Sequence, residues 1–188
     1  ETTIGPLKIN KGCGVLLVDG ELPLPEIKNR LQLLTKSMAG EGKDTPLNIL
    51  SSVYSDAENG RFINLAEKYW RNRITQYFKE NKDAELLVLD NLTSLISGTS
   101  ENAKLGWEPI NQWLLKLRAM GVATILVHHE NKSGKDRGGS FRRDNLDTVI
   151  VLKHDKAEPA DTVSIVVKFE KCRQLKSGEG SDIKLKLE

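Results

Sequence analysis

Residues 86–90 read Leu-Leu-Val-Leu-Asp, a short apolar run that ends in a carboxylate. Three further runs share this length and character, namely Val15–Val18, Leu47–Leu50 and Val122–Val127. Runs this short, apolar and rich in branched residues are typical of strands that are buried on both faces of a parallel sheet. The four runs therefore predict the core strands of an α/β protein.

Amphipathic segments separate these runs. One has eight apolar residues at three- and four-residue spacing, which predicts a helix. They are Phe62, Leu65, Ala66, Tyr69, Trp70, Ile74, Tyr77 and Phe78. A second helix is expected over residues 107–117, with Gly121 at its C-cap, and a weaker one over Pro25–Met38. The alternation predicts a mainly parallel, twisted sheet flanked by helices, with right-handed connections.

The last third of the chain changes character. Leu146–Leu152, Thr162–Phe169 and Ile183–Leu187 are strand-like and are joined by turn-rich links, which predicts antiparallel strands added at the C-terminal edge of the sheet. The length suits one domain over residues 1–188. Within it we expect the parallel core at about 12–152 and the edge strands at about 153–188.

Charge and composition limit the classes of partner. The 28 Lys and Arg residues nearly balance the 26 Asp and Glu residues, so any nucleic-acid contact must come from a local basic patch. The apolar runs fall short of the roughly 18 residues that a membrane helix needs, and no membrane contact is expected. Cys13 and Cys172 form no metal-binding spacing and fit a reducing compartment, so we expect a cytoplasmic protein.

Polar side chains follow three of the expected core strands. They are Asp19-Gly20-Glu21, Asp90-Asn91 and His128-His129-Glu130. Each alone is also what a strand shows where it meets its loop. Ligands of open α/β sheets bind outside the carboxyl ends of the strands, so the three together favour one shared site.

These residue types suit phosphoryl chemistry. An apolar strand that ends in Asp, as at Asp90, has the form of a Walker B strand, whose carboxylate orients Mg²⁺, usually through water. Glu21 could activate a water molecule for in-line attack, and His128 and His129 could detect a γ-phosphate. A metal-dependent hydrolase built from these residues and Asp19 is an alternative. Adjacent imidazoles on a strand point to opposite faces, however, and share one ion only where the strand has ended.

Two basic features lie nearer the C-terminus. Residues 131–143 contain five basic residues, one acidic residue and three glycines, and such a loop could grip a phosphate backbone or be merely solvated. The five are Lys132, Lys135, Arg137, Arg142 and Arg143. Lys171 and Arg173 lie one residue apart on an expected strand and so share a face. They could meet a nucleotide held by a neighbouring subunit, or be a solvent-facing pair.

The ordered set of motifs resembles a known family. It comprises Val18-Asp19-Gly20-Glu21-Leu22-Pro23, Leu87-Val88-Leu89-Asp90-Asn91-Leu92, Val127-His128-His129-Glu130-Asn131-Lys132-Ser133-Gly134 and Arg137-Gly138-Gly139-Ser140. The chain resembles the RecA-like ATPase core of the RepA/DnaB group of hexameric replicative helicases, and within it the RepA-like AAA-type ATPases of plasmids, phages and mobile elements. The resemblance implies ATP and Mg²⁺ as ligands, translocation on single-stranded DNA and a homo-hexamer or other ring.

The resemblance also assigns roles to residues. Glu21 matches the catalytic glutamate that polarises the attacking water, and Asp90 matches the Walker B aspartate. The His128–His129 pair matches the γ-phosphate sensor, with His129 the favoured residue. Residues 131–143 resemble the loop that faces the central channel and contacts DNA. The Lys171 and Arg173 pair resembles the Lys-x-Arg pair that reaches the adjacent subunit's nucleotide.

The sequence departs from the family at the phosphate-binding loop. The motif GxxxxGK[ST] does not occur in these 188 residues, and Gly12-Cys13-Gly14 lacks the Lys and Ser/Thr that meet the phosphates and Mg²⁺. We therefore expect an N-terminally truncated piece of a RecA-like domain that binds ATP poorly by itself. The alternatives are a relative that never had the loop and a non-catalytic nucleic-acid-binding or regulatory module on the same scaffold.

Overall fold

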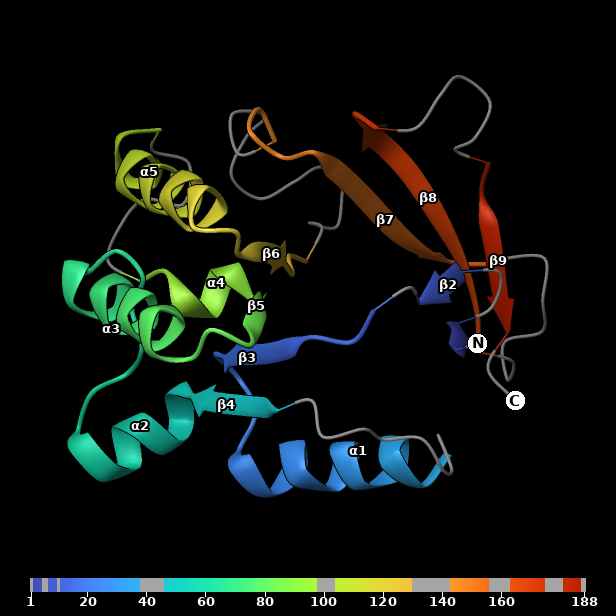
Figure 1. Ribbon diagram of the computed structural model, residues 1–188. Coiled ribbons are helices and arrows are strands. Elements are labelled where there is room, and N and C mark those ends of the chain that lie inside the picture. Colours follow the sequence, from blue (N-terminus) through green and yellow to red (C-terminus); the bar gives the residue numbers. More distant parts are fainter. Residues whose placement is uncertain are drawn as a thin grey trace. The chain divides into compact units, whose positions relative to one another are not determined.

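The computed structural model describes residues 2–4, 7–9, 11–37, 46–97, 104–129, 143–155, 163–174 and 181–186 (Figure 1). The chain divides into two compact units, the core unit of residues 12–141 and the strand unit of residues 1–11 and 142–188. The core unit contains β3 (Gly14–Asp19), α1 (Leu24–Ser37), β4 (Leu47–Ser51), α2 (Ser52–Asn59), α3 (Lys68–Glu80), β5 (Ala84–Asp90), α4 (Leu92–Leu95), α5 (Lys104–Ala119) and β6 (Ala123–Leu126). The strand unit contains β1 (Thr2–Ile4), β2 (Leu7–Ile9), β7 (Thr148–His154), β8 (Ser164–Cys172) and β9 (Ile183–Lys186).

The four strands of the core unit form one parallel sheet in the order β4-β3-β5-β6, which confirms the predicted core strands. The chain passes from β3 to β4 on one side and then returns to β5 on the other side of β3. The strand order therefore reverses between β3 and β5, the position at which open α/β sheets bind ligands. The register pairs Asp19 of β3 with Asp90 of β5, so both carboxylates lie at this switch point.

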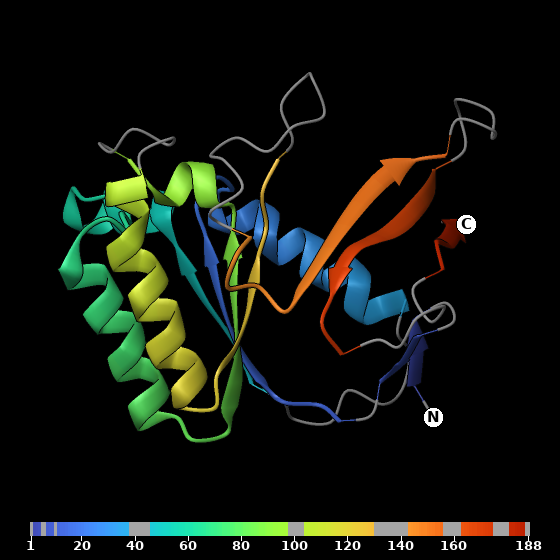
Figure 2. The same ribbon diagram turned by 90° about the horizontal axis from the view of Figure 1, so that it is seen from above.

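Helices cover both faces of the parallel sheet. Helices α3 and α5 lie side by side on one face, and α1 lies on the other (Figure 2). Trp70, Ile74 and Phe78 of α3 and Ile110 and Leu117 of α5 are buried against the strands in one apolar core. The sheet-facing stripes predicted for these two helices are thus confirmed. Of the described helices, none is both long and apolar enough to cross a membrane.

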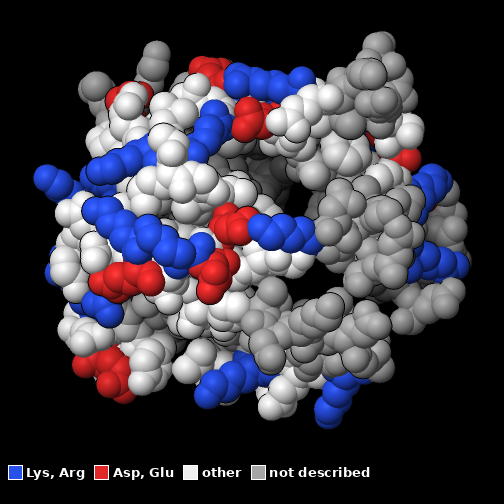
Figure 3. All heavy atoms as spheres, viewed as in Figure 1, with Lys and Arg blue, Asp and Glu red and all other residues white. Residues whose placement is uncertain are grey.

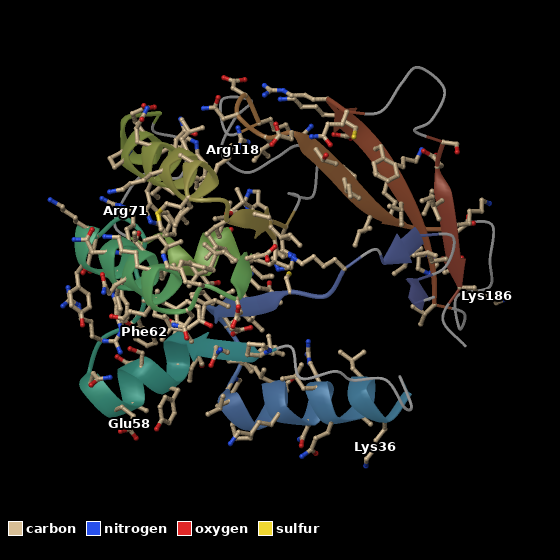
Figure 4. The ribbon with its side chains drawn as sticks, viewed as in Figure 1. Lys36, Glu58, Phe62, Arg71, Arg118 and Lys186 are labelled. Carbon is tan, nitrogen blue, oxygen red and sulfur yellow. The ribbon has the colours of Figure 1, made fainter. Side chains whose placement is uncertain are left out.

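The predicted helix around residues 62–78 begins later than expected. Residues 61–67 form a loop, α3 starts at Lys68, and Phe62 is 58% exposed in the loop between α2 and α3 (Figure 4). Tertiary contacts satisfy the loop's backbone in place of helical hydrogen bonds. The Leu65 N–H donates to the Leu95 carbonyl at 2.7 Å, and Arg71 Nη1 donates to the Leu65 and Ala66 carbonyls at 2.6 and 2.8 Å. Burial also lowers the pKa of the Arg71 guanidinium.

Local capping explains α2, which the apolar spacing does not predict. Ser51 ends β4 and caps α2 by accepting a hydrogen bond from the Tyr54 N–H at 3.3 Å, and Gly60 closes the helix in the left-handed region with φ of 62°. The expected glycine at the C-terminal end of α5 is confirmed, since Gly121 lies two residues after Ala119 with φ of 85°. The α4 turn and the β1–β2 hairpin were likewise not predicted.

The strand unit confirms the antiparallel character of the C-terminal third. Strands β7, β8 and β9 pair in that order in a three-stranded antiparallel sheet. The described strands of this sheet form a ladder of their own, whereas we expected an extension of the parallel sheet. The boundary between the two units lies between residues 141 and 142, and the expected change of character was near residue 153.

Candidate functional site

The turn after β3 is fixed by Asp19. Its side chain is 3% exposed, and Oδ1 accepts hydrogen bonds from the Glu21 N–H at 2.9 Å and the Leu22 N–H at 2.7 Å. Such bonds from an Asp side chain to the backbone just ahead hold a turn in one conformation. The Gly20 N–H donates to the Asp90 carbonyl at 2.7 Å and ties this turn to the end of β5. The backbone that carries Glu21 therefore has a defined position at the switch point.

The Glu21 carboxylate is exposed and ionised. The Ser94 hydroxyl donates to its Oε1 at 2.7 Å. The pKa of Glu21 is lowered, chiefly by this hydrogen bond and then by the Asn91 side chain, while partial burial acts in the opposite direction. A protonated His129 adds a smaller lowering effect. Glu21 is thus available as a hydrogen-bond acceptor at neutral pH.

The Asp90 carboxylate has the opposite electrostatic environment. Its pKa is raised, chiefly by burial and then by the negative charges of Asp19 and Glu21. The charges of His129 and Arg30 partly offset this effect. The ionised form of Asp90 is therefore destabilised by its surroundings, and a nearby cation would stabilise it.

The two histidines have different surroundings. His128 Nδ1 lies 3.5 Å from the Thr93 hydroxyl, while His129 is exposed. The charge of protonated His129 acts on both Glu21 and Asp90, which places its ring within electrostatic reach of the two acids. The structure thus brings together the acids that follow β3 and β5 and one of the two histidines that follow β6.

The carboxylates of Asp19, Glu21 and Asp90 form an acidic cluster at the switch point. This cluster suits a cation whose remaining ligands come from water and a bound phosphate. In the described part of the chain, no group of three His, Cys, Asp or Glu residues is arranged to hold a metal ion by itself. Asp19 is moreover engaged by the backbone of its own turn. Mg²⁺ commonly takes one or two carboxylates together with waters and substrate phosphates. Asp90 fits that arrangement, and the described residues do not support the alternative of an all-protein metal centre.

Lys171 and Arg173 lie in the strand unit, where their side chains donate hydrogen bonds to backbone carbonyls. Lys171 Nζ donates to the carbonyls of Arg143 and Asp144 at 2.7 and 3.2 Å, and Arg173 Nη2 donates to the Asp144 carbonyl at 2.8 Å. Both side chains reach the Asp144 carbonyl, although Arg173 lies just past the end of β8. Arg173 Nη1 also lies 3.6 Å from the Asp147 carboxylate. Both cations hold the turn that precedes β7.

One of the five basic residues of the 131–143 segment is described. Arg143 donates to the Glu170 carboxylate at 2.6 Å in a half-buried ion pair. Lys132, Lys135, Arg137 and Arg142 lie outside the described residues. On the face drawn in Figure 3, described Lys and Arg side chains are interspersed with Asp and Glu, in keeping with the near-zero net charge.

Sequence reasoning missed Ser94 and the role of Asn91. Asn91 is fully buried and caps α4, where its Oδ1 accepts from the Ser94 N–H at 3.1 Å. Asn is among the residues preferred at a helix N-cap, and Asn91 directly follows the strand that ends at Asp90. That pattern predicts a helix start after Asp90, although it gives no sign of the contact with Glu21.

The sequence matches the AAA domain family over residues 2–135. A search of curated proteins found no match. Among solved structures, the fold is similar to that of a KaiC-like protein from the hyperthermophilic archaeon Pyrococcus horikoshii, with a TM-score of 0.55 and 19% sequence identity. The match covers 94% of this chain and 72% of the other. At this identity the likeness concerns the fold, and it confirms a RecA-like α/β fold.

The family match extends through the residues that form the site, from the turn at Glu21 to the histidines after β6. Its span is well over half of the chain, and the fold comparison agrees with it. The family match supports the prediction of a nucleotide-hydrolysing protein. The chain belongs to the AAA domain family and has a RecA-like fold.

Proposed function

We propose that this chain is the ATP-hydrolysing part of a replicative DNA helicase that translocates on single-stranded DNA. The observation that carries the proposal is the pairing of Asp19 with Asp90 at the switch point, with Glu21 held beside them. Family membership and the RecA-like fold support nucleotide hydrolysis. The helicase role rests on the resemblance of the motifs to replicative helicases.

In this proposal Glu21 orients the attacking water. Its ionised carboxylate accepts a hydrogen bond from the water, whose oxygen attacks the γ-phosphorus in line with the leaving group. The bond from the γ-phosphorus to the bridging oxygen breaks, its electron pair stays with ADP, and the water's proton passes to the carboxylate or to the released phosphate. The His128–His129 pair is the γ-phosphate sensor, and His129 is the residue of the pair that contacts the phosphate.

Asp90 is the residue that would hold Mg²⁺, through water. The ion would neutralise charge on the phosphates and on the acidic cluster. The raised pKa of Asp90 fits this role, because a carboxylate whose charge is unfavourable in the free protein gains most from a bound cation.

The partners belong to the same proposal. Residues Lys132, Lys135, Arg137, Arg142 and Arg143 contact single-stranded DNA. The chain assembles as a hexamer or another ring in the cytoplasm, with Lys171 and Arg173 directed to the nucleotide of an adjacent subunit. Because both cations bind carbonyls of their own unit, this role requires them to exchange those acceptors for phosphate oxygens.

The test is Mg²⁺-dependent ATP hydrolysis, with and without single-stranded DNA. It is measured on this chain and on the longest reading frame that contains it, beside Glu21→Gln. We expect Glu21→Gln to lower kcat about 10²- to 10⁴-fold while nucleotide binding persists. Glu58→Gln is the matched control, since Glu58 is an exposed glutamate on α2.

Three outcomes would contradict the proposal in different ways. Normal turnover by Glu21→Gln would remove the catalytic role of Glu21. Turnover that DNA does not stimulate would remove the translocation role. DNA binding without hydrolysis by any form of the protein would favour a non-catalytic nucleic-acid-binding module.

A further inference from the structure

The Ser94 hydroxyl contacts Glu21 across 73 positions of sequence. Its Oγ donates to Glu21 Oε1 at 2.7 Å, a length typical of a hydrogen bond between a hydroxyl and a carboxylate. Ser94 lies in the first turn of α4, and its own N–H is held by Asn91 Oδ1. The hydroxyl therefore projects from a fixed backbone toward an otherwise exposed side chain.

The neighbouring backbone is built to allow this contact. A Cβ atom at position 20 would lie 2.8 Å from Ser94 Cβ and 3.1 Å from Leu95 Cγ, so a residue larger than glycine would push α4 away from the β3 turn. The Asp19 side chain fixes the Glu21 backbone, and the Gly20 N–H binds the end of β5. Glu21 is thus held at its backbone by its own strand and at its carboxylate by α4.

Helix capping alone does not explain the position of the hydroxyl. Ser94 Oγ lies 3.3 Å from Asn91 Oδ1 and 2.7 Å from Glu21 Oε1, and its single proton serves one acceptor at a time. The shorter distance and the negative charge both favour Glu21. Asn91 already receives the Ser94 N–H, so the cap remains satisfied when the hydroxyl turns to the carboxylate.

We propose that Ser94 is a positioning residue that holds the Glu21 carboxylate toward the attacking water. This inference rests on the proposed function and names a residue that acts through Glu21. With Oε1 bound by Ser94, the carboxylate keeps one orientation at the edge of the sheet. Removing the hydroxyl frees the side chain to rotate, so fewer bound nucleotides meet a correctly placed water.

The experiment compares Ser94→Ala with Ser97→Ala in ATP hydrolysis by the longest reading frame that contains this chain. Ser97 follows α4 closely, and it contacts Asn64 through its backbone atoms. We expect Ser94→Ala to lower kcat about 10- to 100-fold with KM nearly unchanged, and Ser97→Ala to retain wild-type turnover. Added to Glu21→Gln, Ser94→Ala should cost nothing further, because its partner is already disabled. Additive losses in the double variant, or normal turnover by Ser94→Ala, would overturn the inference.

A second readout does not need hydrolysis. The titration of the Glu21 carboxyl carbon is followed by NMR in the wild-type chain and in both serine variants. Loss of the Ser94 hydrogen bond should move the midpoint to higher pH, while Ser97→Ala leaves it in place. An unchanged midpoint in Ser94→Ala overturns the inference. A shifted midpoint, together with no ATP hydrolysis by the longest reading frame that contains this chain, would refute the proposed function and, with it, the catalytic part of this inference, while confirming the contact.

Discussion

The sheets of the core unit and of the strand unit differ in how much of their side-chain surface is buried. In β5 the side chains of Ala84, Leu87 and Leu89 are buried, and helices cover both faces of the sheet. In β7 the central Val151 is buried while Ile150 and Leu152 are 49% and 65% exposed. A sheet that is covered on both faces exposes its strand ends as the place where polar side chains meet a ligand.

The charged groups of the two units differ in the same way. In the core unit, the carboxylates of Asp19, Glu21 and Asp90 gather at the switch point, and the pKa of Asp90 is raised, chiefly by burial and then by the charges of the other two. In the strand unit, Lys171 and Arg173 are satisfied by carbonyls of a nearby turn. The unfavourable negative charge of the core unit lies where a bound cation could relieve it, whereas the paired charges of the strand unit hold local structure.

The largest expected effect concerns the core. Leu87→Ala removes a fully buried side chain from the central strand β5, and we expect it to lower the free energy of unfolding by about 2–5 kcal/mol. Val151→Ala in the strand unit should cost about 1–2 kcal/mol, because it removes two methyl groups from a sheet with exposed neighbours. Urea unfolding with residue-level hydrogen exchange measures both. Equal losses would show that the two sheets are equally well packed.

A second prediction tests the close approach of α4 to the β3 turn. Gly20→Ala places a Cβ atom 2.8 Å from Ser94, and we expect a loss of about 1–3 kcal/mol and a Glu21 titration shifted to higher pH. Gly60→Ala is the control: its Cβ meets no atom within 4 Å, but its φ of 62° is strained for alanine. That control should lose stability and keep the Glu21 titration unchanged. A Gly20→Ala variant with a normal titration would contradict the proposed packing.

A third prediction concerns the unfavourable negative charge of Asp90. Asp90 has a raised pKa, so the folded state binds its proton more tightly than the unfolded state, and the wild type gains stability as the pH falls through the folded pKa. At neutral pH this carboxylate is ionised and unfavourable. Asp90→Asn should therefore raise Tm by about 1–3 °C at pH 7. The advantage should disappear below the unfolded pKa of about 3.9.

The control for this variant is Asp83→Asn, an exposed acid just before β5. Thermal unfolding across the pH range should show no comparable gain for it. If Asp90→Asn were less stable than the wild type at pH 7, the carboxylate would be a structural group rather than a site for a cation.

The smallest expected effect is in the strand unit. Arg173 and Asp147 are both about half exposed and 3.6 Å apart, and such pairs contribute about 0.2–1 kcal/mol. Arg173→Ala should lower the unfolding free energy by no more than about 1 kcal/mol and less at high salt. Lys153→Ala on the exposed side of β7 is the control. A larger, salt-independent loss would show that the Arg173 contacts organise the whole sheet.

The parallel strands could be predicted because burial on both faces leaves unbroken apolar runs in the sequence. The acids at their ends could be predicted for the same reason, since Asp19 and Asp90 follow those runs directly. The prediction of a helix over residues 62–67 was wrong. Apolar spacing does not show that Leu95 and Arg71 form the hydrogen bonds that the backbone of this segment would otherwise make within a helix. Helix periodicity reports which side chains are buried, and a loop can bury them equally well.

The sequence by itself determined the four core strands and the acids at the ends of two of them, Asp19 and Asp90. Each of these features depends on a few consecutive residues. The tertiary structure decided the separate antiparallel sheet of the strand unit and the partners of each site residue. The hydrogen bond from Ser94 to Glu21 joins positions 73 residues apart. It depends on the parallel pairing of β3 with β5 and on glycine at position 20, which has no side chain to push α4 away. Such contacts arise only after the strands have paired, since packing brings together groups that no local pattern connects.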